Sequence, residues 1–216
     1  MNYLALDRID LQFSAGVLGR TASRPTERSW ANLKRVARYL VKHPRVVYKF
    51  YYCGVEEALT LVGYSDSDWA GCKDSRRSVS GGVVLSAGAL LKSWSNRQAT
   101  VARSSAEAEL YAASKTAAEL MGIESLFVDM GWKPTVVPEL YTDSNAAKAI
   151  ASRRGLGRTR HLEVRKIWIQ SAIEDKRIKI KKVAGTENPA DPLTKLKSFQ
   201  DFLAVTMSRA GVAERA

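Results

Sequence analysis

Six carboxylates stand near the ends of predicted strands and helices, where turns of the chain can bring them together. They are Asp66, Asp68, Glu107, Glu109, Asp143 and Asp191. In a mixed sheet, loops and helix starts converge at the carboxyl ends of the central strands, so these side chains are expected to meet. Carboxylates in contact repel one another unless their pKa values rise or a cation binds. Oxygen ligands without nearby histidine or cysteine favour Mg²⁺ or Mn²⁺ over Zn²⁺.

A cluster of this kind is suited to phosphodiester hydrolysis. In-line displacement at phosphorus needs an activated water and a stabilised leaving oxygen, and two divalent cations about 4 Å apart supply both. A Ser-His-Asp or Cys-His mechanism is not expected, because His43 and His161 are the only histidines. His161 lies at the start of a basic helix, where we interpret it as a phosphate contact.

Most of these acids also have a structural explanation when they are taken alone. An aspartate after a strand commonly caps a turn or a helix. Glu107 completes a Ser-x-x-Glu capping box that begins at Ser104, and Asp191 can be a favourable charge at a helix start. Glu109 lacks such an explanation, because it shares a largely apolar helix face with Ala113 and Leu120. The joint occurrence of the acids is what favours a site.

Alternating strand and helix patterns predict the elements that position these acids. Strands are expected at 59–69, 81–86, 90–96, 138–144 and 177–185, and helices at about 104–130, 145–150 and 159–174. The first three strands should be antiparallel because tight turns join them. The strand around Leu140 follows a long helix and should run parallel to the first.

Helices are also expected at both ends of the chain. Pro25-Thr26-Glu27 opens an amphipathic helix that Ser29 can cap and that ends before Pro44. Asp191 is expected to open a helical tail. The predicted fold class is therefore α/β, a mixed five-stranded sheet flanked by helices, with a helical N-terminal extension.

Composition and charge narrow the class of protein. The 216 residues are 45% hydrophobic, which excludes a wholly disordered chain, and no apolar run approaches the ~18 residues of a membrane span. The acids near the N-terminus do not fit a signal peptide, so secretion is not expected. Cys53 and Cys72 cannot form a multi-bridge framework, and neither belongs to a CxxC pair, so we expect a reducing compartment.

The net charge predicts a polyanionic partner. The chain has 34 lysines and arginines against 22 acids, a charge of +12. Between Arg153 and Lys182 eleven cations face three acids. We therefore expect the phosphate-binding surface there, with Arg158 and Arg160 as members, although a solvated helix face is the alternative for any one of them.

Five segments carry a resemblance to a known family. They are YSDSDWAGCKDSRRSVSGGVV (64–84), SWSNRQATVARSSAEAEL (93–110), LYTDSNAAKAIA (140–151), RTRHLEVR (158–165) and VAGTENPADPLTK (183–195). In order and spacing they resemble the ribonuclease H domain of copia-type retrotransposon pol polyproteins, over roughly Leu59 to Leu196. Residues 8–40 resemble the segment that follows the reverse transcriptase in those polyproteins.

The resemblance implies an endonuclease that uses two Mg²⁺ ions, replaceable by Mn²⁺, to cut the RNA strand of RNA–DNA hybrids. The family's four metal-binding acids correspond to Asp66, Glu109, Asp143 and Asp191. Asp68 remains the alternative to Asp66, because the chain has Asp-Ser-Asp where the family motif has one Asp before Gly, and Glu107 remains the alternative to Glu109.

Further residues take expected roles from the same resemblance. Ser104, Ser105 and Asn145 match positions that contact the hybrid in relatives. Many cellular relatives have a histidine in the loop before the last aspartate, and residues 184–188 have none. Glu187 is the available substitute, and slower turnover is the alternative.

The resemblance also sets expectations for domains, partners and location. Residues 1–53 are interpreted as a helical remnant of the reverse transcriptase/connection region, 54–205 as the ribonuclease H-like domain, and 206–216 as a frayed tail. The expected partners are an RNA–DNA hybrid and the reverse transcriptase domain of the same polyprotein, with neither a membrane nor a small-molecule cofactor. The expected location is the cytoplasm, within a virus-like particle, with the nucleus as the alternative. The competing hypothesis is a non-catalytic, connection-like nucleic-acid-binding module.

Overall fold

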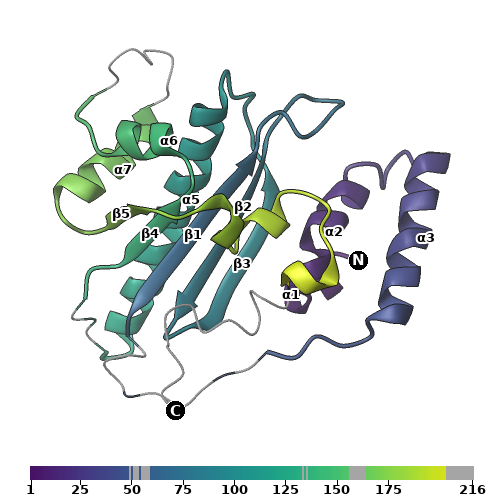
Figure 1. Cartoon of the computed structure of the whole chain (residues 1–216), viewed down its shortest axis with the longest axis horizontal. Helices are drawn as coiled ribbons and strands as arrows, with labels where there is room; N and C mark the ends of the chain where they lie inside the picture. The colour runs from purple at the N-terminus through teal and green to yellow at the C-terminus, as the bar shows by residue number, and fades with distance from the viewer. Residues whose placement is uncertain are drawn as a thin grey trace.

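A mixed sheet of five strands forms the centre of the molecule (Figure 1). The computed structural model describes residues 1–48, 50, 54, 59–132, 134, 136–155 and 164–202. The strands are β1 (Leu61–Asp68), β2 (Val79–Ser86), β3 (Ala89–Arg97), β4 (Glu139–Thr142) and β5 (Lys179–Lys182), in the order β3-β2-β1-β4-β5. β1, β2 and β3 pair antiparallel, whereas β4 runs parallel to both β1 and β5. The predicted fold class and strand directions are confirmed.

The hairpin between β2 and β3 is tighter than the sequence suggested. Its turn consists of Ala87 and Gly88, which have φ values of 46° and 78°, and Ala89 already belongs to β3. Two central residues with positive φ match the twist of the flanking strands, so a two-residue loop suffices. The predicted strands at 59–69, 138–144 and 177–185 are likewise shorter in the structure, because their ends lie in turns and loops.

Helices cover one face of the sheet around α5 (Ser105–Asp129), which packs along β1. α6 (Asn145–Ala151) and α7 (Val164–Glu174) lie beside it (Figure 1). Leu110, Leu120, Leu140 and Ile169 are fully buried in the core of this face. The predicted basic helix at 159–174 is described only from Val164, since residues 156–163 lie outside the described part of the chain.

The opposite face of the sheet is covered by the N-terminal elements and by the segment from Ala190 to Phe202. Val83 and Leu85 of β2 pack there against Ile9, Leu193 and Phe202. The N-terminal elements are α1 (Leu4–Asp7), the 3-10 helix η1 (Ile9–Leu11), α2 (Gln12–Gly19) and α3 (Glu27–Lys42). Alternation along β2 therefore divides its apolar side chains between two cores.

A buried ion pair fixes the N-terminal helices to one another. Asp10, only 6% exposed, binds the Arg8 guanidinium through both carboxylate oxygens at 2.7 and 3.0 Å, and Tyr39 donates its hydroxyl to the same carboxylate at 2.7 Å. The N-cap of α3 is Thr26 rather than Ser29. Ser29 occupies the third helical position and completes a capping box with Thr26.

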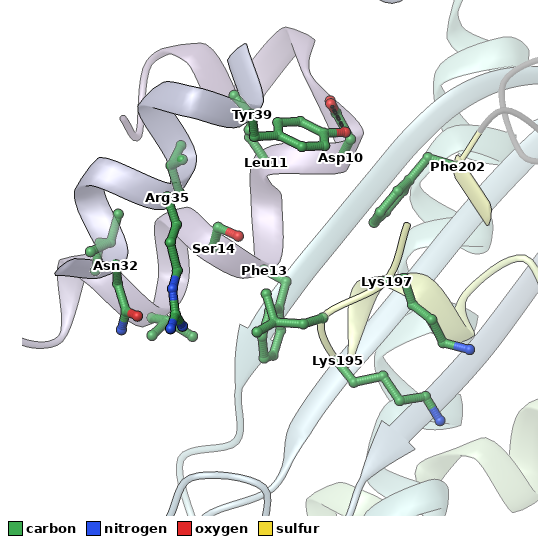
Figure 2. A pocket seen from close by; sticks show the side chains of 14 residues that line it. Asp10, Leu11, Phe13, Ser14, Asn32, Arg35, Tyr39, Lys195, Lys197 and Phe202 are labelled. Atoms are coloured by element: carbon green, nitrogen blue, oxygen red, sulfur yellow. Dashed lines mark hydrogen bonds between the residues drawn. The ribbon is translucent and has the colours of Figure 1, made fainter. Parts of the chain in front are cut away.

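A cavity of about 260 Å³ lies between α2, α3 and the segment around residues 195–202 (Figure 2). Its walls are mainly apolar and include Phe13 and Phe202, with Arg35 and Lys195 among the few charged groups. None of the six acids singled out in the sequence lines this cavity. Lys195, which does line it, also binds one of those acids, Asp191.

The expected helical tail from Asp191 begins as a single turn of 3-10 helix, η3 (Asp191–Leu193). The chain leaves the helix at residues 194–198 and is helical again at residues 199–202, and residues 203–216 lie outside the described part of the chain. Before η3, the short 3-10 helix η2 (Gly185–Glu187) ends at Asn188, which has φ −78° and ψ 107° and which Pro189 restricts to extended backbone. Among the described helices, none combines the length and apolarity needed to cross a membrane.

Gly63 is the position at which a side chain would most directly separate α5 from β1. A Cβ there would lie 2.8 Å from both Leu120 Cδ1 and Thr116 Cγ2. We expect Gly63→Ala to lower the free energy of unfolding by about 1–3 kcal/mol through overpacking. The matched control is Gly122→Ala on the exposed side of α5, where a Cβ meets no atom within 4 Å. That variant should gain up to about 1 kcal/mol in helix propensity. Urea denaturation checks both, and equal stability of the two variants would contradict the packing argument.

Candidate metal centre

Three of the six acids meet at the carboxyl end of β1. Asp66, Glu109 and Asp143 each offer a carboxylate oxygen, and these oxygens lie within 4.8 Å of one another. Asp66 and Glu109 are buried, at 5% and 8% exposure, and Asp143 is half-buried. Three segments distant in sequence therefore supply one group of carboxylates, which we call the acid triad.

The sheet register explains why Asp66 and Asp143 are neighbours. β1 and β4 run parallel, and Ser65 pairs with Thr142, so each aspartate follows its partner residue at the same end of the sheet. Gly185 of η2 lies against this end, since a Cβ there would be 3.2 Å from Asp143 Oδ2. The loop that holds Glu187 is thus adjacent to Asp143, although Glu187 itself is exposed.

Glu109 reaches the site from the second turn of α5. Its Oε1 accepts hydrogen bonds from the Ser67 backbone N–H at 3.2 Å and from the Ser67 hydroxyl at 2.9 Å. Its Oε2 is buried and has no hydrogen-bond partner among the described residues. A buried carboxylate oxygen without a partner is costly, which is the condition that a bound cation relieves.

Burial and mutual repulsion raise the pKa values of the two buried acids. Burial raises the pKa of Asp66 to about 6, the charges of Asp143 and Asp191 add to the effect, and a hydrogen bond from Thr194 opposes it. Burial raises the pKa of Glu109 to about 8, with the charge of Asp66 as a further cause. In the absence of a cation, the triad therefore holds protons near neutral pH.

Glu107 and Asp68, the alternatives to Glu109 and Asp66, do not belong to the acid triad. Glu107 turns away from the triad: its carboxylate accepts hydrogen bonds from the Arg103 backbone N–H at 2.8 Å and from the Tyr111 hydroxyl. Ser104 caps α5 by accepting from Glu107 N–H, as the sequence predicted, but the carboxylate binds N–H one residue before the N-cap. The side chain of the half-buried Asp68 lies against the backbone of Gly71, and burial raises the pKa of Asp68.

Asp191 lies beside the triad without belonging to it. Its carboxylate binds Lys195 Nζ at 2.5 Å and Lys197 Nζ at 2.9 Å. Its charge nevertheless contributes to the raised pKa of Asp66, so the two side chains are close enough to interact. The four predicted ligands are thus brought to one end of the sheet, three as a group and the fourth in an ion pair next to it.

The predicted substrate contacts lie around the same end of the sheet where the structure describes them. Ser104 is the N-cap of α5, Ser105 is the first residue of that helix, and Asn145 is the first residue of α6. Arg158, Arg160 and His161 lie outside the described residues. Of the predicted basic surface, Lys181 pairs with Glu139 at 2.6 Å and Arg154 pairs with Glu174.

Three polar residues that the sequence did not single out hold the acids in place. Ser67 binds Glu109, Thr194 Oγ1 donates to Asp66 Oδ2 at 2.5 Å, and Asn188 Nδ2 donates to the Ser65 carbonyl at 2.9 Å. Ser67 lies between Asp66 and Asp68 in the sequence, and this position could have indicated that it contacts the site. Asn188 and Thr194 lie on either side of Asp191, but their contacts are 123 and 128 residues away in sequence, and no local pattern reveals them.

Comparison with known proteins identifies relatives over nearly the whole chain. It is 32% identical over 205 residues to the retrovirus-related Pol polyprotein from transposon TNT 1-94 of Nicotiana tabacum. It is 32% identical over 207 residues to that from transposon RE1 of Arabidopsis thaliana. Each match covers 94% of this chain, and the chain spans only 15% and 14% of those polyproteins. Homologues of this chain are therefore copia-type Pol polyproteins, and the chain matches one segment of them.

A solved structure shows similarity to this Pol segment at lower identity. It is the N-terminal RNase H domain of Rv2228c from Mycobacterium tuberculosis, solved as a fusion with maltose-binding protein, with a TM-score of 0.45 and 18% identity. The match covers 70% of this chain and 99% of that one. No family model matches the chain.

The donor set of the Pol segment fits a hard divalent cation. The triad offers only oxygen atoms, which suit such a cation. Glu109 Oε2 lacks a partner among the described residues, and burial disfavours the ionised acids. A divalent cation would remove both of these costs, because it binds carboxylate oxygens and favours their ionised forms. The residues that would hold it are Asp66, Glu109 and Asp143.

The raised pKa values predict an unusual pH dependence of stability. Asp66 and Glu109 have pKa values raised from 3.8 and 4.5 to about 6 and about 8, so the folded chain binds more protons than the unfolded chain between about pH 4 and pH 8. Without divalent cations, the free energy of unfolding should therefore fall as the pH rises through this window. We expect Glu109→Gln to be about 1–3 kcal/mol more stable than wild type at pH 8 and similar to it at pH 4.

Urea denaturation in EDTA at several pH values measures this dependence. Asp129→Asn, at an exposed position at the end of α5, is the control and should follow wild type. Addition of Mg²⁺ at pH 8 should stabilise wild type more than Glu109→Gln. A wild-type stability that rises steadily from pH 4 to pH 8 in EDTA would contradict the assigned pKa shifts.

Proposed function

We propose that this chain is a ribonuclease H that uses two Mg²⁺ ions, or Mn²⁺ in their place, to hydrolyse the RNA strand of RNA–DNA hybrids during retrotransposon reverse transcription. The observation that supports it best is the acid triad: three carboxylates within 4.8 Å, with a buried Glu109 oxygen that has no partner in the described structure. The similarity to copia-type Pol polyproteins and the net charge of +12 support a nucleic-acid substrate.

Asp66, Glu109 and Asp143 would hold the cations, and Asp191 is the proposed fourth ligand. When bound there, the cations would supply activation of a water and neutralisation of the leaving oxygen. The role of the protein is to keep the carboxylates oriented and close together, and the bound cations would favour their ionised forms. Ser67 and Thr194 orient Glu109 and Asp66 through hydrogen bonds. Asp191 would exchange its ion pairs with Lys195 and Lys197 for a cation, which the half-exposed Lys195 side chain permits.

Selection of RNA would come from small polar groups at the helix starts beside the triad. An A-form-like minor groove presents 2′-hydroxyls, which serine and asparagine side chains can bind. Ser105 and Asn145 begin α5 and α6, the helices nearest the triad. We propose these residues and Ser104 as minor-groove contacts, and Arg158, Arg160 and His161 as phosphate contacts.

The proposal extends to the organisation of the polyprotein. Residues 1–53 would derive from the reverse transcriptase/connection region, 54–205 would be the nuclease domain, and 206–216 a tail. The reverse transcriptase domain of the same polyprotein would be its partner, and the virus-like particle in the cytoplasm its location, with the nucleus as the alternative.

A cleavage assay on labelled duplexes tests the activity. RNA–DNA hybrid, RNA duplex and DNA duplex are incubated with the chain in Mg²⁺ and in EDTA. We expect cleavage of the RNA strand of the hybrid alone, and only in Mg²⁺. Binding of the hybrid without cleavage in Mg²⁺ or Mn²⁺ would overturn the proposed activity and favour the non-catalytic binding module.

Asp143→Asn tests the mechanism at the least buried member of the triad. The change keeps size and shape but removes one charge and one strong oxygen ligand, so cleavage should fall by orders of magnitude. Hybrid binding, measured by fluorescence anisotropy, should persist or tighten because a repulsive charge near the phosphate is gone. Asp129→Asn is the control and should cleave at the wild-type rate. Near wild-type cleavage by Asp143→Asn would show that Asp143 is only a turn residue.

A further inference from the structure

Residues 188–197 form a segment that closes over the end of β1, here called the C-terminal clasp. Asn188 is 4% exposed, and its Nδ2 donates to the Ser65 carbonyl while its Oδ1 accepts from Ala190 N–H at 3.1 Å. The clasp is thereby attached to the residue directly before Asp66. Its contact is with the backbone of the strand that supplies a triad acid.

Thr194 makes the second attachment, and it does so through the acid itself. The residue is fully buried, and Oγ1 lies 2.5 Å from Asp66 Oδ2 and 3.0 Å from the Asp191 carbonyl. A hydroxyl has one hydrogen, and an ionised carboxylate is the stronger acceptor. The Thr194 hydroxyl therefore donates its hydrogen to Asp66 and binds one of the two oxygens of that carboxylate.

A glycine on the neighbouring strand permits this close approach. Gly81 of β2 pairs with Asp66 in the sheet register. A Cβ at Gly81 would lie 2.7 Å from the Ala190 carbonyl oxygen, 2.9 Å from Leu193 Cβ and 3.0 Å from Thr194 Cγ2. The clasp thus rests directly on the sheet, and Leu193 is fully buried there.

Glu109 is held in a comparable way. Ser67 donates to Glu109 Oε1 and leaves Oε2 without a partner in the described structure. Both buried acids of the triad therefore have one oxygen fixed by a hydroxyl. Outer hydrogen bonds of this kind orient metal ligands, and their loss commonly costs about 10- to 100-fold in metal affinity.

We propose that Thr194 is a positioning residue for the acid triad, whose hydroxyl fixes one oxygen of Asp66 and so directs the other toward the cation shared with Glu109 and Asp143. This inference rests on the proposed function, because it assumes that the triad binds a divalent cation. The inference adds that Thr194, a residue of the clasp that is not itself a ligand, sets the affinity of the site for the cation.

Two pairs of proteins isolate the hydroxyl. Wild type and Thr194→Val have similar shape, and Thr194→Ser and Thr194→Ala both lack the methyl group but differ by one oxygen. Calorimetric titration with Mn²⁺ in the absence of nucleic acid gives the affinity, and single-turnover cleavage over a range of hybrid concentrations separates binding from rate. The control is Thr116→Val, which removes an equally buried threonine hydroxyl that donates to Ala112 within α5.

We expect Thr194→Val and Thr194→Ala to bind Mn²⁺ about 10- to 100-fold more weakly, with a matching loss of rate and little change in hybrid affinity. Thr194→Ser should stay within about threefold of wild type, and Thr116→Val should bind Mn²⁺ like wild type. If one of the two pairs does not fold, the other decides.

Two results would overturn the positioning role alone while the proposed function stands. One is wild-type Mn²⁺ affinity in Thr194→Val, and the other is equal weakening in Thr194→Ser and Thr194→Ala, which would assign the effect to packing. A wild-type protein that binds no Mn²⁺ would instead overturn the metal site, and the positioning role with it.

Discussion

The carboxylates of Asp66 and Glu109 are buried, and they lie beside each other and beside Asp143. The organisation of this end of the sheet depends on that contact. Their repulsion is weakly screened because little solvent reaches them. The raised pKa values of both acids express this cost. A chain that only needed stability would place apolar residues here, so the arrangement is best explained by a cation that the acids bind together.

The N-terminal helices show how the same chain treats a buried acid that has a structural role. Asp10 is as buried as Asp66, yet it binds the Arg8 guanidinium through two hydrogen bonds and accepts a third from Tyr39. That carboxylate is fully compensated by protein groups. The triad has hydroxyl donors but no lysine or arginine in direct contact with Asp66 or Glu109 among the described ion pairs. The difference in partners separates a structural acid from the acids proposed as ligands.

Small residues allow the elements around the triad to approach closely enough to hold it. Gly63 lets α5 pack against β1, which brings Glu109 to Ser67, and Gly81 lets the clasp lie on β2, which brings Thr194 to Asp66. The two lysines that follow Asp191 in the clasp bind its carboxylate beside the triad. Packing, hydrogen bonding and electrostatics therefore converge on one carboxylate, Asp66.

The sequence by itself determined the α/β class, the directions of the strands and the six acids from which the triad is drawn. These follow from local signals: the period of apolar residues, the tight turn at Gly88, and the long helix that makes the strand around Leu140 parallel. Only the tertiary structure decided which acids meet. Glu107 and Glu109 are two residues apart on one helix, and orientation toward Tyr111 or Ser67 separates them. The clasp was expected to be part of one helix, but it contains only the single 3-10 turn η3, and Asn188 and Thr194 make side-chain hydrogen bonds to β1, more than 120 residues away. Contacts at such separation leave no periodic trace in a single sequence, so their discovery required the folded chain.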